Sequence, residues 1–146
     1  MKVLFLDIDN VLNRDGTKEK FCEFDGLDKA LLERFLHWKN TAQPDLKIVL
    51  SSSWRIPCPF GDFMKHLNDN GITWIDVTPN LGGVDRGLEI LAWLKDHPEV
   101  TQWAVLDDLQ VGHVGNRLVQ TSPKRGVENK HLAKINKLLH DTSPTN

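Results

Sequence analysis

The chain is poor in several features that would define a functional class at once. It has only two cysteines, Cys22 and Cys58, without repeated spacing or a zinc-type arrangement with histidine, so we expect neither a disulfide framework nor a zinc site. Its longest apolar runs fall far short of the roughly 20 residues of a membrane span. Met1 leads directly into the first predicted strand without the pattern of a signal peptide. These absences favour a cytoplasmic protein that has no membrane partner.

Charge and length narrow the choice further. The formal net charge is -2, so no global basic field indicates binding to nucleic acid. This net charge does not exclude a local basic patch. With 146 residues, 40% hydrophobic and 26% charged, the chain fits one globular domain with a single core. We assign this domain to residues 1–141 and expect residues 142–146 to form a flexible tail. The sequence implies no obligate protein partner.

Short apolar segments alternate with helical patterns along the chain. The expected strands are residues 3–6, 47–50, 72–77, 103–106 and 117–120. Four helices are expected to begin at Asp25, near residue 62, at Asp85 and near residue 127, with Asp25 and Asp85 as N-caps. Strands that alternate with helices predict an α/β fold with a mainly parallel, five-stranded sheet.

Asp7 and Asp9 are the most informative residues, because they follow the unbroken apolar run at residues 3–6. Such a run suits a strand that is buried on both faces of a parallel sheet, and ligands bind beyond the carboxyl ends of such strands. Two carboxylates this close repel each other unless a cation or a shared proton relieves them. Mg2+ takes oxygen ligands from carboxylates and substrate phosphate. The pair therefore indicates metal-assisted phosphoryl chemistry.

Two further strands end in residues that suit the same chemistry. Ser51, Ser52 and a third serine follow the strand at 47–50, and Asp107 and Asp108 follow the strand at 103–106. All these strand ends lie along one edge of a parallel sheet. Arg86 begins the third helix on that side, just after its predicted cap. Taken singly, each signal has a plainer explanation, since aspartate often caps helices, serines mark loops and arginine is commonly solvated.

In this order the segments resemble the haloacid dehalogenase-like (HAD) phosphohydrolase superfamily. Its four motifs are matched by Asp7-Ile8-Asp9, by Val49-Leu50-Ser51, by Arg86 and by Leu106-Asp107-Asp108. More narrowly, the segments at 6–9, 49–55, 86–94, 105–108 and 118–121 look like a small HAD family that includes phosphatase domains of multidomain RNA-repair proteins. The resemblance covers residues 3 to about 126. It implies a Rossmann-like three-layer sandwich with a minimal cap or none.

The resemblance also implies catalytic roles. Asp7 would be the nucleophile that forms an aspartyl-phosphate, and Asp9 would protonate the leaving oxygen and then activate water. Ser51 and the backbone N–H groups after it would bind phosphate oxygens. Arg86 would neutralise the phosphoryl charge and hold Asp7 in place. The sequence departs from the family pattern at Asn10, where glycine is common, and at Arg86, where lysine is more frequent.

A Mg2+ site would be formed by Asp7, Asp107 and Asp108 with the backbone carbonyl of Asp9. Asp107 is expected to be the better direct ligand, and Asp108 to bind directly or through water. Asp85 is expected to cap its helix rather than to bind metal.

Other residues are assigned to the substrate or to the rim of the site. Ser52 and Arg55 are expected to contact substrate phosphate, and Lys124-Arg125 to add charge at the rim. Two roles are equally compatible with Trp54, namely stacking on a base or ring of the substrate and packing in the core. His113, just after the acidic pair, is expected to be an exposed loop residue.

These features predict a Mg2+-dependent phosphomonoester hydrolase with an open site. The open site would admit nucleotides, nucleic-acid ends or a phosphoprotein, and the resemblance favours nucleotide or nucleic-acid phosphate. Phosphotransfer or nuclease activity on the same metal site is an alternative, as is a silent phosphate-binding module or a receiver-like domain phosphorylated on Asp7. The presence of Asp9 favours turnover, because a receiver needs an acceptor but no acid/base.

Overall fold

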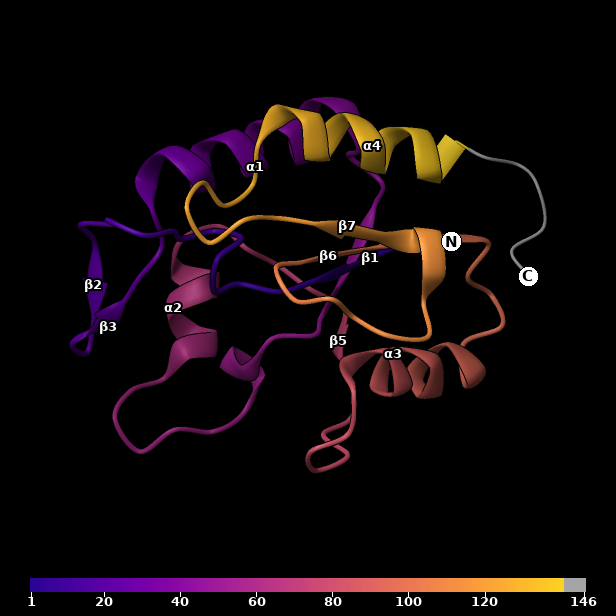
Figure 1. The fold of residues 1–146 in the computed structure, drawn as a ribbon, viewed down its shortest axis with the longest axis horizontal. Helices are drawn as coiled ribbons and strands as arrows, with labels where there is room; N and C mark the ends of the chain where they lie inside the picture. Colours follow the sequence, from indigo (N-terminus) through magenta and orange to yellow (C-terminus); the bar gives the residue numbers. More distant parts are fainter. Residues whose placement is uncertain (141–146) are drawn as a thin grey trace.

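A five-stranded, fully parallel sheet lies at the centre of the computed structural model, which describes residues 1–140. Its strand order is β5-β4-β1-β6-β7 (Figure 1). The strands are β1 (Lys2–Leu6), β4 (Lys47–Leu50), β5 (Asp76–Val77), β6 (Gln102–Asp107) and β7 (Leu118–Gln120). The predicted α/β fold with a mainly parallel sheet is confirmed. The predicted tail at 142–146 lies outside the described residues, and the domain boundary stays a prediction.

Alternation along β1 produces the layers of the fold. Leu4 and Leu6 pack in the larger core beneath α1 (Lys29–Ala42) and α4 (Asn129–His140), to which α2 (Phe63–Asp69) also contributes. Val3 and Phe5 point the other way and pack in a second core against α3 (Arg86–Lys95). Figure 1 shows α1 and α4 on one side of the sheet and α3 on the other. This arrangement is the expected Rossmann-like three-layer sandwich.

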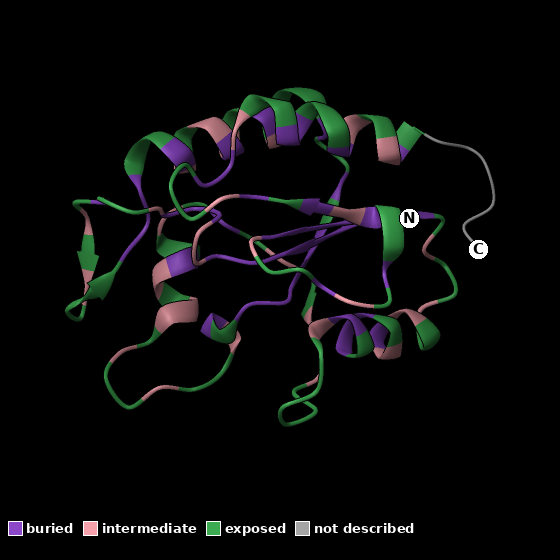
Figure 2. Cartoon of the chain, viewed as in Figure 1, coloured by how far each residue is buried: buried purple, intermediate pink, exposed green. Residues whose placement is uncertain are grey.

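Burial is concentrated in the sheet and in the helix sides that face it (Figure 2). Phe5 is fully buried, and its ring meets Trp93 and Trp103 edge-on with centroid distances of 5.5 and 6.0 Å. Burying a side chain of this size contributes roughly 1.5–3 kcal/mol. The unbroken apolar run of β1 is thus explained by helices on both faces of the sheet.

The position of β1 determines where the strand ends converge. The chain leaves β1 toward β4 and β5 on one side and returns to β6 and β7 on the other, so the strand order switches direction beside β1. Parallel pairing continues just past the strand ends, where Asp7 N–H donates to Leu106 O and Ser51 N–H donates to Leu6 O, both at 3.0 Å. A switch point of this kind opens a crevice for ligands.

The first helix begins later than predicted. Asp25 lies in β3 (Phe24–Asp25), which pairs with β2 (Lys20–Phe21) in a small antiparallel hairpin. Asp28 caps α1 instead, because its carboxylate accepts hydrogen bonds from the N–H groups of Ala30 and Leu31. Both aspartates precede apolar helical spacing, and only the tertiary position of the hairpin distinguishes them.

Three other boundaries differ from the predicted ones. The third strand, predicted at residues 72–77, is restricted to β5. Ile72 instead follows the end of α2, where its N–H donates to Leu67 O. Arg117 precedes β7 in a short helical turn, and its guanidinium donates to Leu138 O at 3.3 Å. The last helix starts at Asn129, because Val127 N–H bonds to Val11 O.

Nothing larger than the β2–β3 hairpin separates β1 from α1, and only a loop at 56–62 joins the short helical turn η1 (Ser53–Arg55) to α2. The expected minimal cap is therefore present as a hairpin and a loop within residues 1–140. In the same range, no helix has the length and apolar character needed to cross a membrane.

Gly87 offers a test of how the loop after β6 is held. A Cβ at this position would lie 1.6 Å from the carbonyl oxygen of Gly112, which is backbone and cannot rotate away. We expect Gly87→Ala to lower the free energy of unfolding by about 3 kcal/mol, within the range for overpacking. Leu88→Ala, on the exposed side of the same helix, should change it by less than about 1 kcal/mol. Denaturant unfolding measures both, and equal stability of the two variants would contradict the predicted contact.

Candidate active site

Three carboxylates converge at the switch point of the sheet. Asp7 follows β1, Asp107 ends β6, and Asp108 follows it, and one oxygen from each lies within 4.8 Å of the others. Asp7 and Asp107 are buried, whereas Asp108 is partly exposed. No other group of this kind occurs among residues 1–140. The structure thus brings together acids that are 100 residues apart in the chain because their strands are neighbours.

Arg86 supplies the positive charge of this cluster. Its Nη1 lies 2.8 Å from Asp107 Oδ2 and 3.1 Å from Asp7 Oδ1. Asp85 positions it, because its Oδ1 accepts the N–H groups of Gly87 (2.7 Å) and Gly112 (3.0 Å) and so joins α3 to the loop after β6. The expectations that Asp85 caps the helix and that Arg86 approaches Asp7 are consistent with these contacts.

The electrostatics of the cluster follow from burial. Burial raises the pKa of Asp7 well above its usual value, and the negative charge of Asp107 raises it further, whereas Arg86 opposes the shift. Burial likewise raises the pKa of Asp107, against the effect of Arg86. Burial alone would lower the pKa of Arg86, but attraction to Asp7 and Asp107 outweighs it and the net direction is upward. One arginine thus only partly balances three carboxylates.

Ser51 lies beside this cluster on the neighbouring strand. It is fully buried, and its Oγ has no hydrogen-bond partner within the described part of the chain. A buried hydroxyl without a partner is costly in a folded protein and is common where a ligand completes the bonding. Ser52 is engaged differently, because its Oγ accepts the N–H of Trp54 at 3.1 Å and caps η1.

Asp9 is held by two donors that converge on one oxygen. Trp54 Nε1 donates to Asp9 Oδ1 at 3.1 Å, and Asn13 Nδ2 donates to the same oxygen at 3.0 Å. Asn13 is itself fixed by a second bond to Gly26 O. The sequence left the role of Trp54 open and did not single out Asn13. No spacing rule relates Trp54 to Asp9, because 45 residues separate them.

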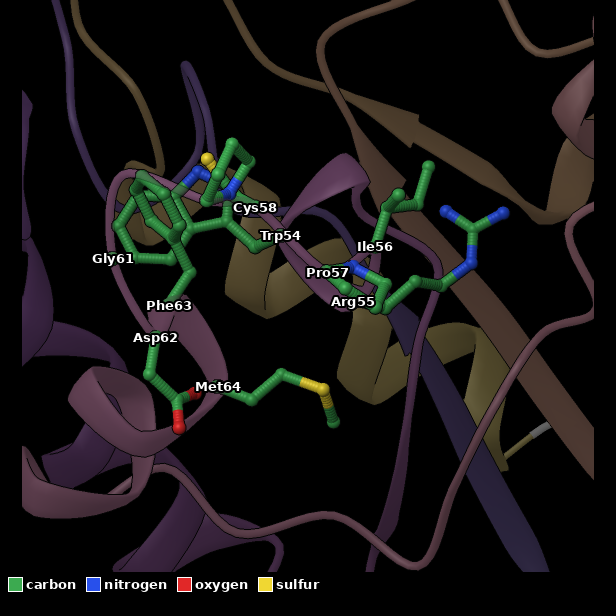
Figure 3. Close-up of a pocket in the computed structure, with 10 residues that line it drawn as sticks. Trp54, Arg55, Ile56, Pro57, Cys58, Gly61, Asp62, Phe63 and Met64 are labelled. Carbon is green, nitrogen blue, oxygen red and sulfur yellow. The ribbon is translucent and has the colours of Figure 1, made fainter.

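Arg55 makes contacts that favour a structural role. Its guanidinium pairs with Glu89 at 3.0 Å and also donates to the backbone oxygens of Ser52 and Thr78, while both charged side chains are only 6% exposed. Figure 3 shows the Arg55 side chain pointing away from Trp54 and Phe63. The assignment of Arg55 to substrate stays a prediction, and the observed contacts weigh against it.

Asn10 forms the turn after Asp9, although the family commonly has glycine at this position. Its φ is 62°, in the left-handed region that asparagine tolerates better than most residues. Its Nδ2 donates to Asp108 Oδ2 at 3.1 Å, and its carbonyl accepts the Thr121 hydroxyl at 2.7 Å. Asparagine thus provides a contact to the acidic cluster that glycine lacks.

The remaining predicted residues lie outside the cluster. His113 is exposed, in agreement with its assignment to a loop. Lys124 and Arg125 are also exposed, and Arg125 lies 3.7 Å from Glu128.

Comparison with known proteins identifies the family of the chain. Residues 3–132 match the family described as the HAD domain in Swiss Army Knife RNA repair proteins. The chain belongs to this family. Membership supports a HAD-type, phosphatase-like function and agrees with the resemblance seen in the motifs. No curated protein and no solved structure matches the chain.

Asn10 gives a test of the turn after the acids. Alanine cannot adopt the left-handed conformation without strain of about 1–2 kcal/mol, whereas glycine can. We therefore expect Asn10→Ala to be less stable than Asn10→Gly by about 1 kcal/mol or more in denaturant unfolding. Equal stability of the two variants would show that the left-handed backbone is not required at this position.

Proposed function

We propose that this HAD domain is a Mg2+-dependent phosphomonoester hydrolase that works through an aspartyl-phosphate on Asp7. The observation that carries the proposal is the group formed by the buried Asp7 and Asp107 and the partly exposed Asp108 beside Arg86. Family membership supports the same class of reaction. A cytoplasmic location and the absence of an obligate partner belong to the proposal as expectations.

The chemistry of these residues fits a hard divalent cation. Three carboxylates against one arginine leave two negative charges if all the acids are ionised, and carboxylate oxygen is the ligand that Mg2+ prefers. Both oxygens of Asp107 already accept hydrogen bonds, from Arg86 (2.8 Å) and from Leu109 N–H (3.0 Å). Asp108 accepts one, from Asn10. These contacts favour Asp108 over Asp107 as the direct ligand, against the expectation from the resemblance.

In the proposed first step, a carboxylate oxygen of Asp7 bonds to phosphorus while the bond from phosphorus to the leaving oxygen breaks. Asp9 gives its proton to that leaving oxygen. Arg86 and Ser51 are placed to stabilise the phosphoryl group through its oxygens. Bound Mg2+ would offset the negative charge that gathers between the phosphoryl group and the carboxylates.

In the second step, water attacks phosphorus, Asp9 accepts the proton of that water, and the bond from phosphorus to Asp7 breaks. Inorganic phosphate and the free carboxylate result. The hydrogen bonds from Trp54 and Asn13 to one Asp9 oxygen leave the other oxygen for proton transfer. This arrangement supports turnover over a receiver-like switch, which needs no held acid/base.

The substrate is a phosphomonoester, and nucleotides or nucleic-acid terminal phosphates are the class that the family suggests. A nuclease or phosphotransferase would use the same acids but cleave or exchange a different bond. Assays with phosphodiester and phosphomonoester substrates separate these activities.

Hydrolysis of p-nitrophenyl phosphate tests the proposal directly. Asp7→Asn should lower kcat at least about 100-fold, because no acceptor for the phosphoryl group remains. Nitrophenolate leaves without a proton, so Asp9→Asn should release about one equivalent in a burst and then turn over slowly. The exposed Asp15→Asn serves as the matched control and should keep full activity. Undiminished turnover by pure Asp7→Asn would rule out the assigned nucleophile.

Metal binding is tested by calorimetric titration with Mg2+. Replacing Asp107 or Asp108 by asparagine should weaken Mg2+ binding. We expect the larger loss of affinity, at least about tenfold, for Asp108→Asn. Asp107→Asn should lose less, because its oxygens are already shared with Arg86 and Leu109. Asp15→Asn again provides the control. An unchanged affinity in Asp108→Asn would remove that residue from the ligand set.

A further inference from the structure

A pocket of ≈ 500 Å³ adjoins the candidate active site on the side of Asp9. It is bounded by the β2–β3 hairpin, the loop at 56–62 and the turn after β1. The lining residues that bear on its chemistry are Asp9, Phe24, Asp25, Trp54, Ile56 and Phe63. The volume lies within the usual range for small-molecule sites. The pocket of Figure 3 shares Trp54, Ile56, Cys58 and Phe63 with it but is lined by none of the clustered acids.

Aromatic rings from three separate elements form the walls. Phe24 of the hairpin lies 5.8 Å from Phe63 of α2, and Trp54 of η1 lies 4.9 Å from Phe63, measured between ring centroids. Phe24 is 48% exposed and Ile56 40%, so much of this apolar surface is open to solvent. A flat apolar ring would cover it and would stack on aromatic faces.

The lining offers no free counter-charge to an anion. Asp9 and Asp25 are its acidic members, and among residues 1–140 no lysine, arginine or histidine lines it. Arg14 and Arg55 each adjoin a lining residue in the sequence, but they pair with Asp28 and Glu89. Lys20 pairs with Asp25 across the hairpin, 2.5 Å away, and is therefore not free to bind an anion. A second phosphate or a carboxylate in this pocket would lose its hydration without gaining a counter-charge.

The proposed mechanism determines which part of a substrate enters. Asp9 gives its proton to the leaving oxygen, so the leaving group must lie against Asp9 when the bond to phosphorus breaks. Asp9 lines the pocket, whereas the buried Ser51 and Asp107 do not. The phosphoryl group belongs with the buried cluster, and the alcohol that departs belongs in the aromatic pocket.

We infer that this pocket selects phosphomonoesters whose leaving group carries one uncharged aromatic ring and no further anionic group. The inference rests on the proposed function, because it assigns the leaving group to the side of Asp9. Phe24, Trp54 and Phe63 provide the ring contacts, and within residues 1–140 the lining offers no free cation to an additional negative charge. A nucleoside monophosphate meets this description, whereas a nucleotide with another phosphate beside its ring does not.

Three alkyl phosphates with similar leaving-group chemistry test the pocket. Phenethyl phosphate carries a neutral ring, ethyl phosphate has none, and para-carboxyphenethyl phosphate adds a charge to the ring. We expect kcat/KM for phenethyl phosphate to exceed that for ethyl phosphate by about tenfold or more, because the ring is buried and stacked. The carboxylated substrate should lose most of this advantage.

Variants at exposed positions test which residues produce the preference for a ring. Phe24→Ala should reduce the preference for the ring to less than about threefold, because one wall of the pocket is removed. Ile75→Ala is the control, since Ile75 is also an exposed apolar residue, at 49%, but does not line this pocket. Asp25→Asn frees Lys20 from its ion pair and should raise kcat/KM for the carboxylated substrate relative to phenethyl phosphate.

Binding of phosphonates, which cannot be hydrolysed by this route, separates failure of the pocket from failure of the proposed function. Tighter binding of phenethyl phosphonate than of ethyl phosphonate, lost in Phe24→Ala, would support the pocket even if no phosphate ester turned over. Turnover with equal kcat/KM for phenethyl phosphate and ethyl phosphate would contradict the proposed selectivity of the pocket, although it would agree with the proposed phosphatase activity. A preference for the ring that Phe24→Ala does not change would overturn it as well, as would equal binding of the two phosphonates.

Discussion

The site depends on the burial of like charges beside a single arginine. Asp7 and Asp107 are almost completely inaccessible to solvent, and within residues 1–140 only Arg86 pairs with them as a counter-charge. Isolated buried carboxylates are strongly unfavourable, so this arrangement is retained at a cost in stability. Binding of a cation and a phosphoryl group, as proposed for these acids, would offset this cost. The hydroxyl of Ser51, buried without a partner, adds to the same strain.

Contacts outside the cluster keep this strained group in place. Asp85 ties α3 to the loop after β6 and so fixes the start of the helix that bears Arg86. The pair of Arg55 and Glu89 connects η1 to α3, and it is buried, so losing one partner would cost about 3–5 kcal/mol. Trp54, next to Arg55 in η1, then holds Asp9. The turn η1 therefore contacts α3 through the side chain of Arg55 and Asp9, the proposed acid/base, through that of Trp54.

Access to the site is decided by elements too short to form a cap domain. The β2–β3 hairpin and the loop at 56–62 leave the crevice open and contribute aromatic rings beside Asp9. Phe21 and Phe24 of the hairpin both pack on Phe63 of α2, with centroid distances of 5.0 and 5.8 Å. The hairpin is thus joined to the core through side chains, although its two strands are only two residues each.

The sequence by itself determined the fold class and the strand ends that carry the acids. Apolar runs such as Val3–Leu6 and helical spacing are local signals, and parallel strands place their carboxyl ends together. It did not determine that Asp28 rather than Asp25 caps α1, because both positions satisfy the local rule. Only the tertiary structure decided that Trp54 and Asn13 hold Asp9 and that Arg55 turns toward Glu89. Such contacts depend on where loops distant in the chain meet, and neither periodicity nor spacing records that.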